Sequence, residues 1–320
     1  MAVVTVLVAG VALWLEDRFT RPGPLGREMV VLIPRGATLG EIADRLGGAR
    51  VIADPALFRL AAYLSGKSRR LKAGEYSFGG GESAEAVMNR LVAGITVARR
   101  LTVAEGLTTA QVLQQLEAAE GLDGAITERP SEGEVLPSTY FYSYGDSRNE
   151  LVRRMRAEMR RTLDELWSAR APGHPLASPE EALILASIVE RETSREDERA
   201  RVAAVFLNRL KRGMPLQADP TVVYAITRGQ RPLERSLTTA DLGLDSPYNT
   251  YLSRGLPPGP IANPGMAALL AVLHPVSSDE LFFVADGTGG HAFGRTLDEH
   301  EKNVARLRRT RLERGTSEKP

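Results

Sequence analysis

The feature that most constrains the fold of this chain is a helix-like run at residues 183–193, which is apolar almost without interruption as far as Glu190. A helix start signal precedes it, in which Ser178 is the N-cap, Pro179 takes the first helical position and Glu181 completes a capping box. A helix that is apolar around most of its surface belongs in a protein core. We therefore expect a domain built around this helix, with a carboxylate at its end that is costly to bury unless it has a use.

The position of Glu190 on this helix indicates a general acid. At about 100° per residue, Leu183, Ala186 and Ser187 share a side with Glu190, whereas Glu192 points about 200° away. Burial disfavours the ionised form of a carboxyl and raises its pKa, which lets the group hold a proton near neutral pH. The spacing equally allows an ordinary ion pair at the helix end, for which the candidate partners are Arg191, Arg195 and Arg199.

Composition excludes several classes of function. The chain has 320 residues, enough for two or three domains, and at 43% hydrophobic and 25% charged it is typical of a globular protein. The net charge of +1 gives no case for nucleic acid as a partner. There are no cysteines, and the four histidines contain no i, i+4 pair, so we expect neither a disulfide nor a bound metal.

The N-terminal residues predict a membrane anchor over residues 1–16. Residues 2–15 carry no charge and end near Trp14, which suits a membrane interface. As a helix they would span roughly 21 Å, against about 30 Å for a hydrocarbon core, and no basic residues precede them. We expect an anchor whose first residues lie before this start. A cleaved signal and a buried soluble helix remain the alternatives.

Residues 17–28 have the composition of a linker, and a turn-plus-helix pattern then recurs between residues 29 and 118. Each copy has a glycine, a hydroxyl residue two positions later and apolar residues on one helical face; the glycines are Gly36, Gly81 and Gly106. Capping boxes are predicted for Thr38 with Glu41 and for Thr108 with Gln111. Strands are expected at 29–33 and 95–103. The pattern fits small carbohydrate-binding modules of the LysM type, although any capped helix after a strand gives the same spacing.

The C-terminal two thirds of the chain predict a second, larger domain at residues 119–311. An acidic and aromatic loop spans 132–142, and helices are expected at 148–170, from 179, around 202–210 and at 296–311. A buried strand is expected within 279–286, and residues 312–320 should form a flexible tail. The region 213–265 is rich in glycine, proline and aromatic residues, which favours stiff loops.

Two of these loops carry residues suited to sugar binding. In the first, Asp219 precedes a proline and is expected to be extended, while Thr221 can cap the helix that follows. In the second, Tyr248 and Asn249 combine an aromatic ring, which stacks on apolar sugar faces, with an amide, which bonds hydroxyls. Ordered loops with a purely structural role give the same patterns.

Taken together, these motifs resemble one family. The segments 188–193, 205–210, 213–221, 248–251, 255–261 and 282–287, with the loop from Glu132 to Tyr140, are similar in order and in type to the YceG-like (MltG-type) endolytic murein transglycosylases. The resemblance extends over residues 29–306. It implies an α+β fold in which a LysM-like subdomain region at 29–118 precedes a mixed α/β catalytic domain at 119–311.

The resemblance implies a lytic transglycosylase that cleaves the β-1,4 bond between N-acetylmuramic acid and N-acetylglucosamine. The family's catalytic glutamate maps onto Glu190, which would protonate the leaving oxygen and then act as base for the muramyl C6 hydroxyl, giving a 1,6-anhydro end. Glu190→Gln should abolish cleavage and Glu192→Gln should be milder. Because the nucleophile belongs to the substrate, no second carboxylate is required, although Asp219 or Glu132 remains open in that role.

The same resemblance supplies the remaining site residues and the cellular setting. The residues expected to bind the glycan are Gln217, Asp219, Thr221, Tyr248, Asn249 and Glu132. No cofactor is implied. The family's enzymes are single-pass proteins of the inner (cytoplasmic) membrane that act on nascent peptidoglycan outside it, in cell-wall biogenesis and control of glycan length. Peptidoglycan glycan strands, the membrane and peptidoglycan synthases are therefore the expected partners.

The chain departs from the family pattern at a few positions. Pro215 stands where a basic residue is usual, and Ser138 stands where an aspartate is frequent, which removes one candidate carboxylate. Similar chains have also been labelled aminodeoxychorismate lyases, but the lysines lie outside the core motifs, so no Schiff-base lysine for pyridoxal phosphate is expected. Two further functions stay open, a non-catalytic glycan-binding scaffold of the cell-wall machinery and a muramidase that uses water.

Overall fold

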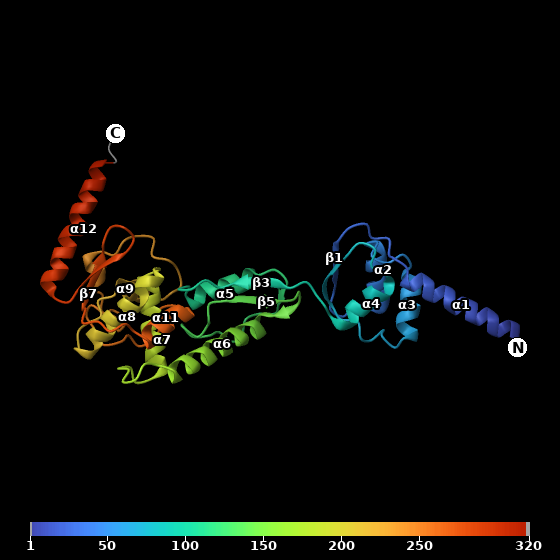
Figure 1. The fold of residues 1–320 in the computed structure, drawn as a ribbon, viewed down its shortest axis with the longest axis horizontal. Coiled ribbons are helices and arrows are strands. Elements are labelled where there is room, and N and C mark those ends of the chain that lie inside the picture. Colours follow the sequence, from blue (N-terminus) through green and yellow to red (C-terminus); the bar gives the residue numbers. More distant parts are fainter. Residues whose placement is uncertain (1, 318–320) are drawn as a thin grey trace. The chain divides into compact units, whose positions relative to one another are not determined.

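The structure, a computed structural model, describes residues 2–317 and divides into two compact units (Figure 1). The first unit contains Met1–Arg100, Glu120–Asp123 and Phe141–Ser147. The second contains Leu101–Ala119, Gly124–Tyr140 and Arg148–Pro320. Each unit has a hydrophobic core of its own.

Helices and small sheets alternate along the chain, as expected for a mixed α+β protein. The helices are α1 (Ala2–Thr20), α2 (Leu39–Gly48), α3 (Pro55–Leu64), α4 (Ala84–Ala93), α5 (Thr109–Ala118), α6 (Arg148–Ser168), α7 (Pro179–Glu192), α8 (Glu196–Lys211), α9 (Asp219–Thr227), α10 (Thr239–Leu242), α11 (Met266–Leu273) and α12 (Leu297–Ser317). The strands are β1 (Met29–Ile33), β2 (Gly74–Phe78), β3 (Arg99–Thr102), β4 (Leu122–Asp123), β5 (Thr139–Tyr142), β6 (Asp146–Ser147), β7 (Phe282–Ala285) and β8 (His291–Gly294). Among the described residues the strands pair only in twos: β1 with β2, β3 with β5, β4 with β6 and β7 with β8.

The first unit is a small sheet covered by capped helices. Strands β1 and β2 are antiparallel, with Met29 opposite Phe78, and helices α2 and α3 connect them. The capping box predicted for Thr38 and Glu41 is confirmed. Alternate residues of β2, together with Phe58 from α3, are fully buried, so one face of the sheet packs against the helices.

The N-terminal helix is longer than the segment 1–16 predicted as an anchor, and the segment after it is bonded to the first unit. Helix α1 continues to Thr20 and packs against α3 and α4. The backbone N–H of Gly23 then donates to the carbonyl of Glu82 at 3.1 Å, and Leu25 is buried, so residues 21–28 are fastened to the first unit. Over residues 2–317, no helix combines the length and the apolar character needed to cross a membrane. The anchor at residues 1–16 stays a prediction.

Helix α5 lies in the second unit, although its sequence pattern groups it with residues 29–118. Its predicted capping box of Thr108 and Gln111 is confirmed. The hydroxyl of Thr108 also donates to the carbonyl of Gly229 at 2.6 Å, and the backbone N–H of Thr109 donates to the carboxylate of Glu132 at 2.7 Å. The repeated pattern reports local capping, whereas these long-range bonds decide to which unit the helix belongs.

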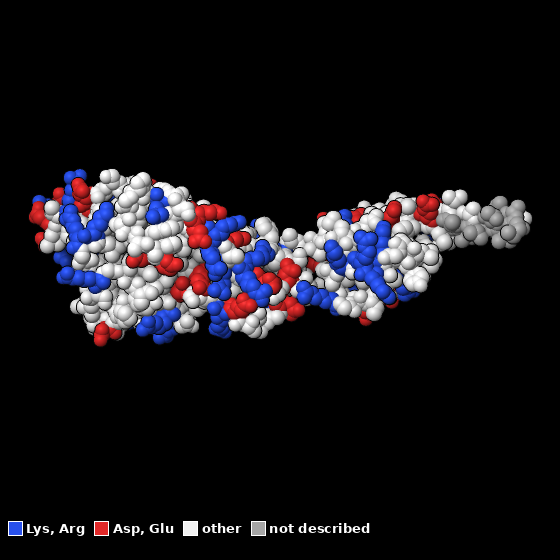
Figure 2. All heavy atoms as spheres, turned by 90° about the horizontal axis from the view of Figure 1, so that it is seen from below, with Lys and Arg blue, Asp and Glu red and all other residues white. Residues whose placement is uncertain are grey.

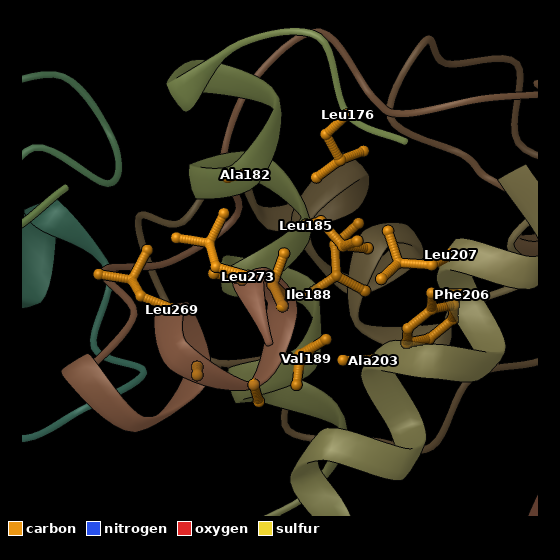
Figure 3. Close-up of a cluster of buried hydrophobic side chains, with 14 of the residues drawn as sticks. Leu176, Ala182, Leu185, Ile188, Val189, Ala203, Phe206, Leu207, Leu269 and Leu273 are labelled. Atoms are coloured by element: carbon orange, nitrogen blue, oxygen red, sulfur yellow. The ribbon is translucent and has the colours of Figure 1, made fainter. Parts of the chain in front are cut away.

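The core of the second unit is built around α7, and this prediction is confirmed. Leu185, Ile188 and Val189 are fully buried on α7. Figure 3 shows them meeting Phe206 of α8 and Leu273 of α11. The C-terminal end of α7 is thereby fixed in place by the tight packing of its other turns.

The last part of the chain is more regular than predicted. Strands β7 and β8 form an antiparallel pair, and α12 packs against both. Helix α12 continues to Ser317, so the tail predicted for residues 312–320 is helical up to that point, and residues 318–320 lie outside the described residues. Figure 2 shows positive and negative side chains interspersed over the face in view, in keeping with the net charge of +1.

Candidate active site

A cavity of about 450 Å³ lies in the second unit beside the end of α7. It is bounded by α7, α8, the start of α9, the β7–β8 pair and α12. Polar and titratable side chains form much of its lining: Glu192, Arg209, Gln217, Asp219, Tyr251, His291 and His300. A second cavity, of about 580 Å³, lies on the other side of Asp219, which lines both. Concave sites with converging polar groups are where ligands bind.

Glu192 is the carboxyl most altered by this environment. The residue is partly buried, and its Oε2 atom is shielded from solvent without a hydrogen-bond partner among the described residues. Burial, reinforced by the negative charge of Asp219 and opposed by Arg209, raises the pKa of Glu192 to about 7. A carboxyl with such a pKa holds a proton near neutral pH and can release it during a reaction.

Arg209 organises the floor of the cavity from helix α8. Its buried guanidinium donates from Nε to the carbonyl of Leu281 at 2.7 Å and from Nη1 to the carbonyl of Leu216 at 2.8 Å. Nη1 also donates to Oε1 of Gln217 at 3.2 Å. Gln217 has a backbone φ of 52°, a left-handed conformation that residues other than glycine rarely adopt. Such strain is concentrated at functional sites, and here the bonds from Arg209 help to maintain it.

Asp219 and Tyr251 form the opposite wall. Asp219 is the first residue of α9, where the helix dipole favours an anion, and its side chain is exposed to the cavity. The hydroxyl of Tyr251 donates to Oδ1 of Asp219 at 2.5 Å. Burial and the hydrogen bond to Asp219 raise the pKa of Tyr251, so the phenol stays protonated and fixes the orientation of the carboxylate.

A histidine held by a carboxylate completes the cavity. His291 lies on β8, and Glu198 lies in the first turn of α8. The Oε2 atom of Glu198 is 2.7 Å from Nδ1 of His291, and Oε1 accepts the backbone N–H of His291 at 3.0 Å. Because a carboxylate accepts hydrogen bonds, this pairing makes Nδ1 the protonated nitrogen of His291.

Glu190 lies in a different environment at the same end of α7. Its side chain is only 6% exposed, and its Oε2 accepts the backbone N–H of Gly265 at 3.0 Å. Burial raises the pKa of Glu190; Gly265 opposes this shift, Glu105 adds to it, and Arg199 opposes it. Arg199 is 3.9 Å away, so the ion-pair alternative has a partner as well. Glu190 lines neither of the two cavities beside Asp219. Its assignment as the acid stays a prediction.

The structure brings together only some of the predicted glycan-binding residues. Gln217 and Asp219 line the cavity that contains Glu192. Thr221 and Asn249 are fully buried and hydrogen-bonded inside the unit, since Thr221 bonds Thr250 at 2.9 Å and Asn249 donates to two carbonyls of the 242–244 segment. We interpret these two as positioning residues for the adjacent loops.

The remaining two predicted residues are not among those that line either cavity. Tyr248 packs with Tyr224, at 4.9 Å between ring centroids, against the core of the second unit. Glu132 accepts hydrogen bonds from Thr109 and Asn263, and burial raises its pKa. Glu132 therefore ties the 132–142 loop to helix α5.

Several residues of the cavity were not identified from the sequence as site residues. Glu192 points away from the apolar face of α7, so its helical position alone gives it less weight than Glu190. Tyr251 lies in the 248–251 segment, but the sequence gives it no role of its own. His291 and Glu198 are far apart in the chain, and only a glycine turn before the histidine marks the position.

Comparisons with known proteins agree with the sequence motifs. A model of the YceG-like family matches residues 31–306. A Bacillus subtilis (strain 168) protein named endolytic murein transglycosylase is 32% identical over 301 residues, which cover 84% of this chain and 82% of that protein. A Streptococcus pneumoniae protein of the same name is 29% identical over 321 residues, and this chain spans 58% of its length.

A solved structure also indicates that this chain is similar to YceG-like proteins. The crystal structure of a yceG-like protein from Listeria monocytogenes matches with a TM-score of 0.54 and 30% sequence identity, over 87% of this chain and 99% of that one. The family match therefore extends through the end of α7, the α8 and α9 helices and the β7–β8 pair that enclose the cavity. This chain belongs to the YceG-like family.

Proposed function

We propose that this protein is an endolytic peptidoglycan lytic transglycosylase. It cleaves the β-1,4 bond between N-acetylmuramic acid and N-acetylglucosamine in nascent glycan strands and leaves 1,6-anhydro ends, in cell-wall assembly and control of glycan length. Two relatives that align over most of this chain are named endolytic murein transglycosylases. The observation that carries the chemistry is a buried carboxyl, Glu192, that lines a cavity together with further polar groups. Burial raises the pKa of this carboxyl.

We assign the proton transfers to Glu192. In its protonated form it donates to the leaving glycosidic oxygen as the C1–O bond breaks. The resulting carboxylate then accepts the proton of the muramyl C6 hydroxyl while O6 bonds to C1, so one group serves both steps and no enzyme nucleophile is consumed. Arg209, which opposes the rise in pKa, stabilises the carboxylate between the two transfers.

The competing assignment is Glu190, two residues earlier. Its burial also raises its pKa, but its carboxylate accepts a backbone N–H at the start of α11 and is outside the two cavities beside Asp219. A general acid must come within hydrogen-bond reach of the oxygen it protonates. Glu192 lines the cavity that also contains Gln217 and Asp219, which supports the choice between them.

Gln217, Asp219 and Tyr251 would bind the glycan around Glu192. The amide of Gln217 and the carboxylate of Asp219 are both exposed to the cavity and are suited to sugar hydroxyls. Asp219 also supports the muramidase alternative. In that reaction a second carboxylate in the same cavity would activate a water molecule. Reducing ends in place of anhydro ends are the product that this alternative predicts.

The first unit would hold the glycan and place the enzyme at the membrane. Its order β1, α2, α3, β2, with short capped helices on a two-stranded sheet, supports a LysM-like glycan-binding role. We further propose that the N-terminal segment anchors the protein in the inner (cytoplasmic) membrane with the second unit outside, where peptidoglycan synthases would be partners.

The test is digestion of purified glycan strands, with the ends identified by mass spectrometry. The wild type should give anhydro ends. Glu192→Gln should lower the initial rate by at least about 100-fold, as expected when a general acid is lost, and Glu190→Gln is the matched neighbour and should keep most of the rate. Loss with Glu190→Gln alone would return the acid role to Glu190. Intact strands with the wild type would refute the proposed reaction.

A further inference from the structure

The cavity on the other side of Asp219 has a strongly basic lining that the proposed reaction does not use. It has a volume of about 580 Å³, which is within the usual range for ligand pockets. Three arginines line it, Arg191 from the end of α7 and Arg231 and Arg235 from the loop after α9. Asp219 is the single carboxylate in its lining.

The charges of these arginines are only partly compensated within the unit. Arg235 forms an ion pair with Asp241, at 2.6 Å. Arg191 donates to the backbone carbonyl of Gly106 at 3.2 Å and has no carboxylate within 4 Å among the described residues. Arg231 is exposed and has no ion-pair partner in residues 2–317. Two guanidiniums therefore remain available to an anion at one concave surface.

Neutral polar groups complete the same cavity. Thr108, Gln111, Tyr224 and Ser236 contribute hydroxyl and amide groups to the lining. Such a surface can supply hydrogen bonds to a peptide backbone in addition to the ionic contacts with its charged groups. Isolated surface arginines are usually solvated, whereas arginines that line one cavity with polar walls can bind an oxyanion together.

The basic cavity adjoins the cavity in which we propose that the glycosidic bond is cut, because Asp219 lines both. The last turn of α7 places Arg191 in the basic cavity and Glu192 in the cavity described above, and Asp219 borders both. A ligand bound at Glu192 that carries an anionic branch could therefore extend the branch past Asp219 toward the arginines.

We propose that the basic cavity binds carboxylates of the peptide that the muramyl sugar carries next to the cleaved bond. This inference rests on the proposed function, because it assumes a peptidoglycan substrate. In that polymer the peptide branches from the lactyl ether of the muramyl residue, the sugar whose C1 reacts. Planar guanidiniums bind carboxylates through two parallel hydrogen bonds, so Arg191 and Arg231 would make the enzyme prefer peptide-bearing strands.

The test compares two substrates, strands that keep their peptides and strands from which an amidase has removed them. With the full-length protein, the wild type should have a lower KM for peptide-bearing strands. Arg231→Gln should reduce this preference by about fivefold, the factor expected from about 1 kcal/mol for an exposed ionic contact. Arg235→Gln should reduce it less, because Arg235 is already paired with Asp241. Arg161→Gln, an exposed arginine on α6 outside both cavities, should preserve the preference.

Binding measurements separate this proposal from the proposed reaction. Fluorescence anisotropy with the Glu192→Gln protein should show tighter binding of peptide-bearing strands, and free stem peptide should compete. If the wild type cleaves neither substrate, the reaction fails while this preference still supports the site. Equal binding of the two strands, equal loss of preference in Arg161→Gln, or competition by inorganic phosphate without competition by the peptide would overturn the peptide assignment.

Discussion

At the residue scale, two carboxyls at one helix end have come to occupy different environments. Glu190 continues the apolar face of α7 and is held against the start of α11, whereas Glu192 borders a cavity with polar walls. Burial raises the pKa of both. Desolvation therefore does not separate the two candidates, whereas the cavity lining, which includes Glu192 and not Glu190, does.

The pH dependence of cleavage should follow Glu192. The acid must be protonated to donate, so kcat/KM should fall as the pH rises through about 7, the pKa of Glu192. Initial rates measured between about pH 5 and pH 9 would give this profile. Asp219 contributes to the raised pKa, so Asp219→Asn should move the descending limb to lower pH. An unchanged limb in that variant would argue against Glu192 as the titrating acid.

The same shift has a consequence for stability. The pKa of Glu192 is about 7 in the folded protein and 4.5 as its reference value, so the folded state binds the proton more tightly. Stability from this group is complete below about pH 4.5 and is lost as the pH rises toward about 7. Glu192→Gln should therefore raise Tm at pH 8 and leave it nearly unchanged at pH 4.5. A lower Tm at pH 8 would contradict this sign.

His291 should depend on Glu198 for its orientation. Glu198→Gln weakens the hold on Nδ1, so we expect kcat to fall by about tenfold with little change in KM, as for a misplaced group at a reaction centre. Glu196→Gln, in the same first turn of α8, is the matched control and should keep full kcat. A higher KM with an unchanged kcat, measured by steady-state kinetics, would instead indicate that His291 holds the substrate.

At the element scale, α7 is the support on which the cavity depends. Leu185 is fully buried in the cluster formed with α8 and α11, so Leu185→Ala should destabilise the protein by about 3 kcal/mol. Leu252→Ala is a control, because that side chain is 57% exposed. Urea denaturation would measure both free energies of unfolding. Comparable values for the two variants would mean that α7 is not the centre of the core.

Several elements were predictable because their signals are local. The N-cap of Ser178, the capping boxes at Thr38 and Thr108 and the strand at 29–33 are all found where the sequence places them. A cap is a contact between residues three positions apart, so it can be read without knowing the fold. The extent of β3, which is shorter than the predicted 95–103, depends on where pairing with another strand ends.

At the scale of the whole molecule, the chain has two separate cores. The cluster around Phe58 belongs to the first unit and the cluster around α7 to the second. Phe58→Ala should therefore destabilise the first unit by about 4 kcal/mol and leave the protection of α7 unchanged in hydrogen exchange. Soluble glycan strands should still be cleaved. Loss of protection in α7 would show that the two cores unfold as one.

The division between the units illustrates what sequence periodicity does not report. Helix α5 has the same turn, cap and apolar stripe as α2 and α4, yet its bonds to Gly229, Ser131 and Glu132 place it in the second unit. The pattern is set by capping and amphipathicity, which are the same for every such helix. The partner of the apolar face is a property of the tertiary fold.

The sequence by itself determined the capped helices, the buried helix α7, the order of motifs and the YceG-like resemblance. Each depends on neighbours in the chain or on residue types in a fixed order. The tertiary structure alone decided that Gln217, Asp219, Tyr251 and His291 surround Glu192, and that three arginines line the adjoining cavity. Helical spacing defines directions around one helix, but burial, pKa and access are produced by other elements that pack against it.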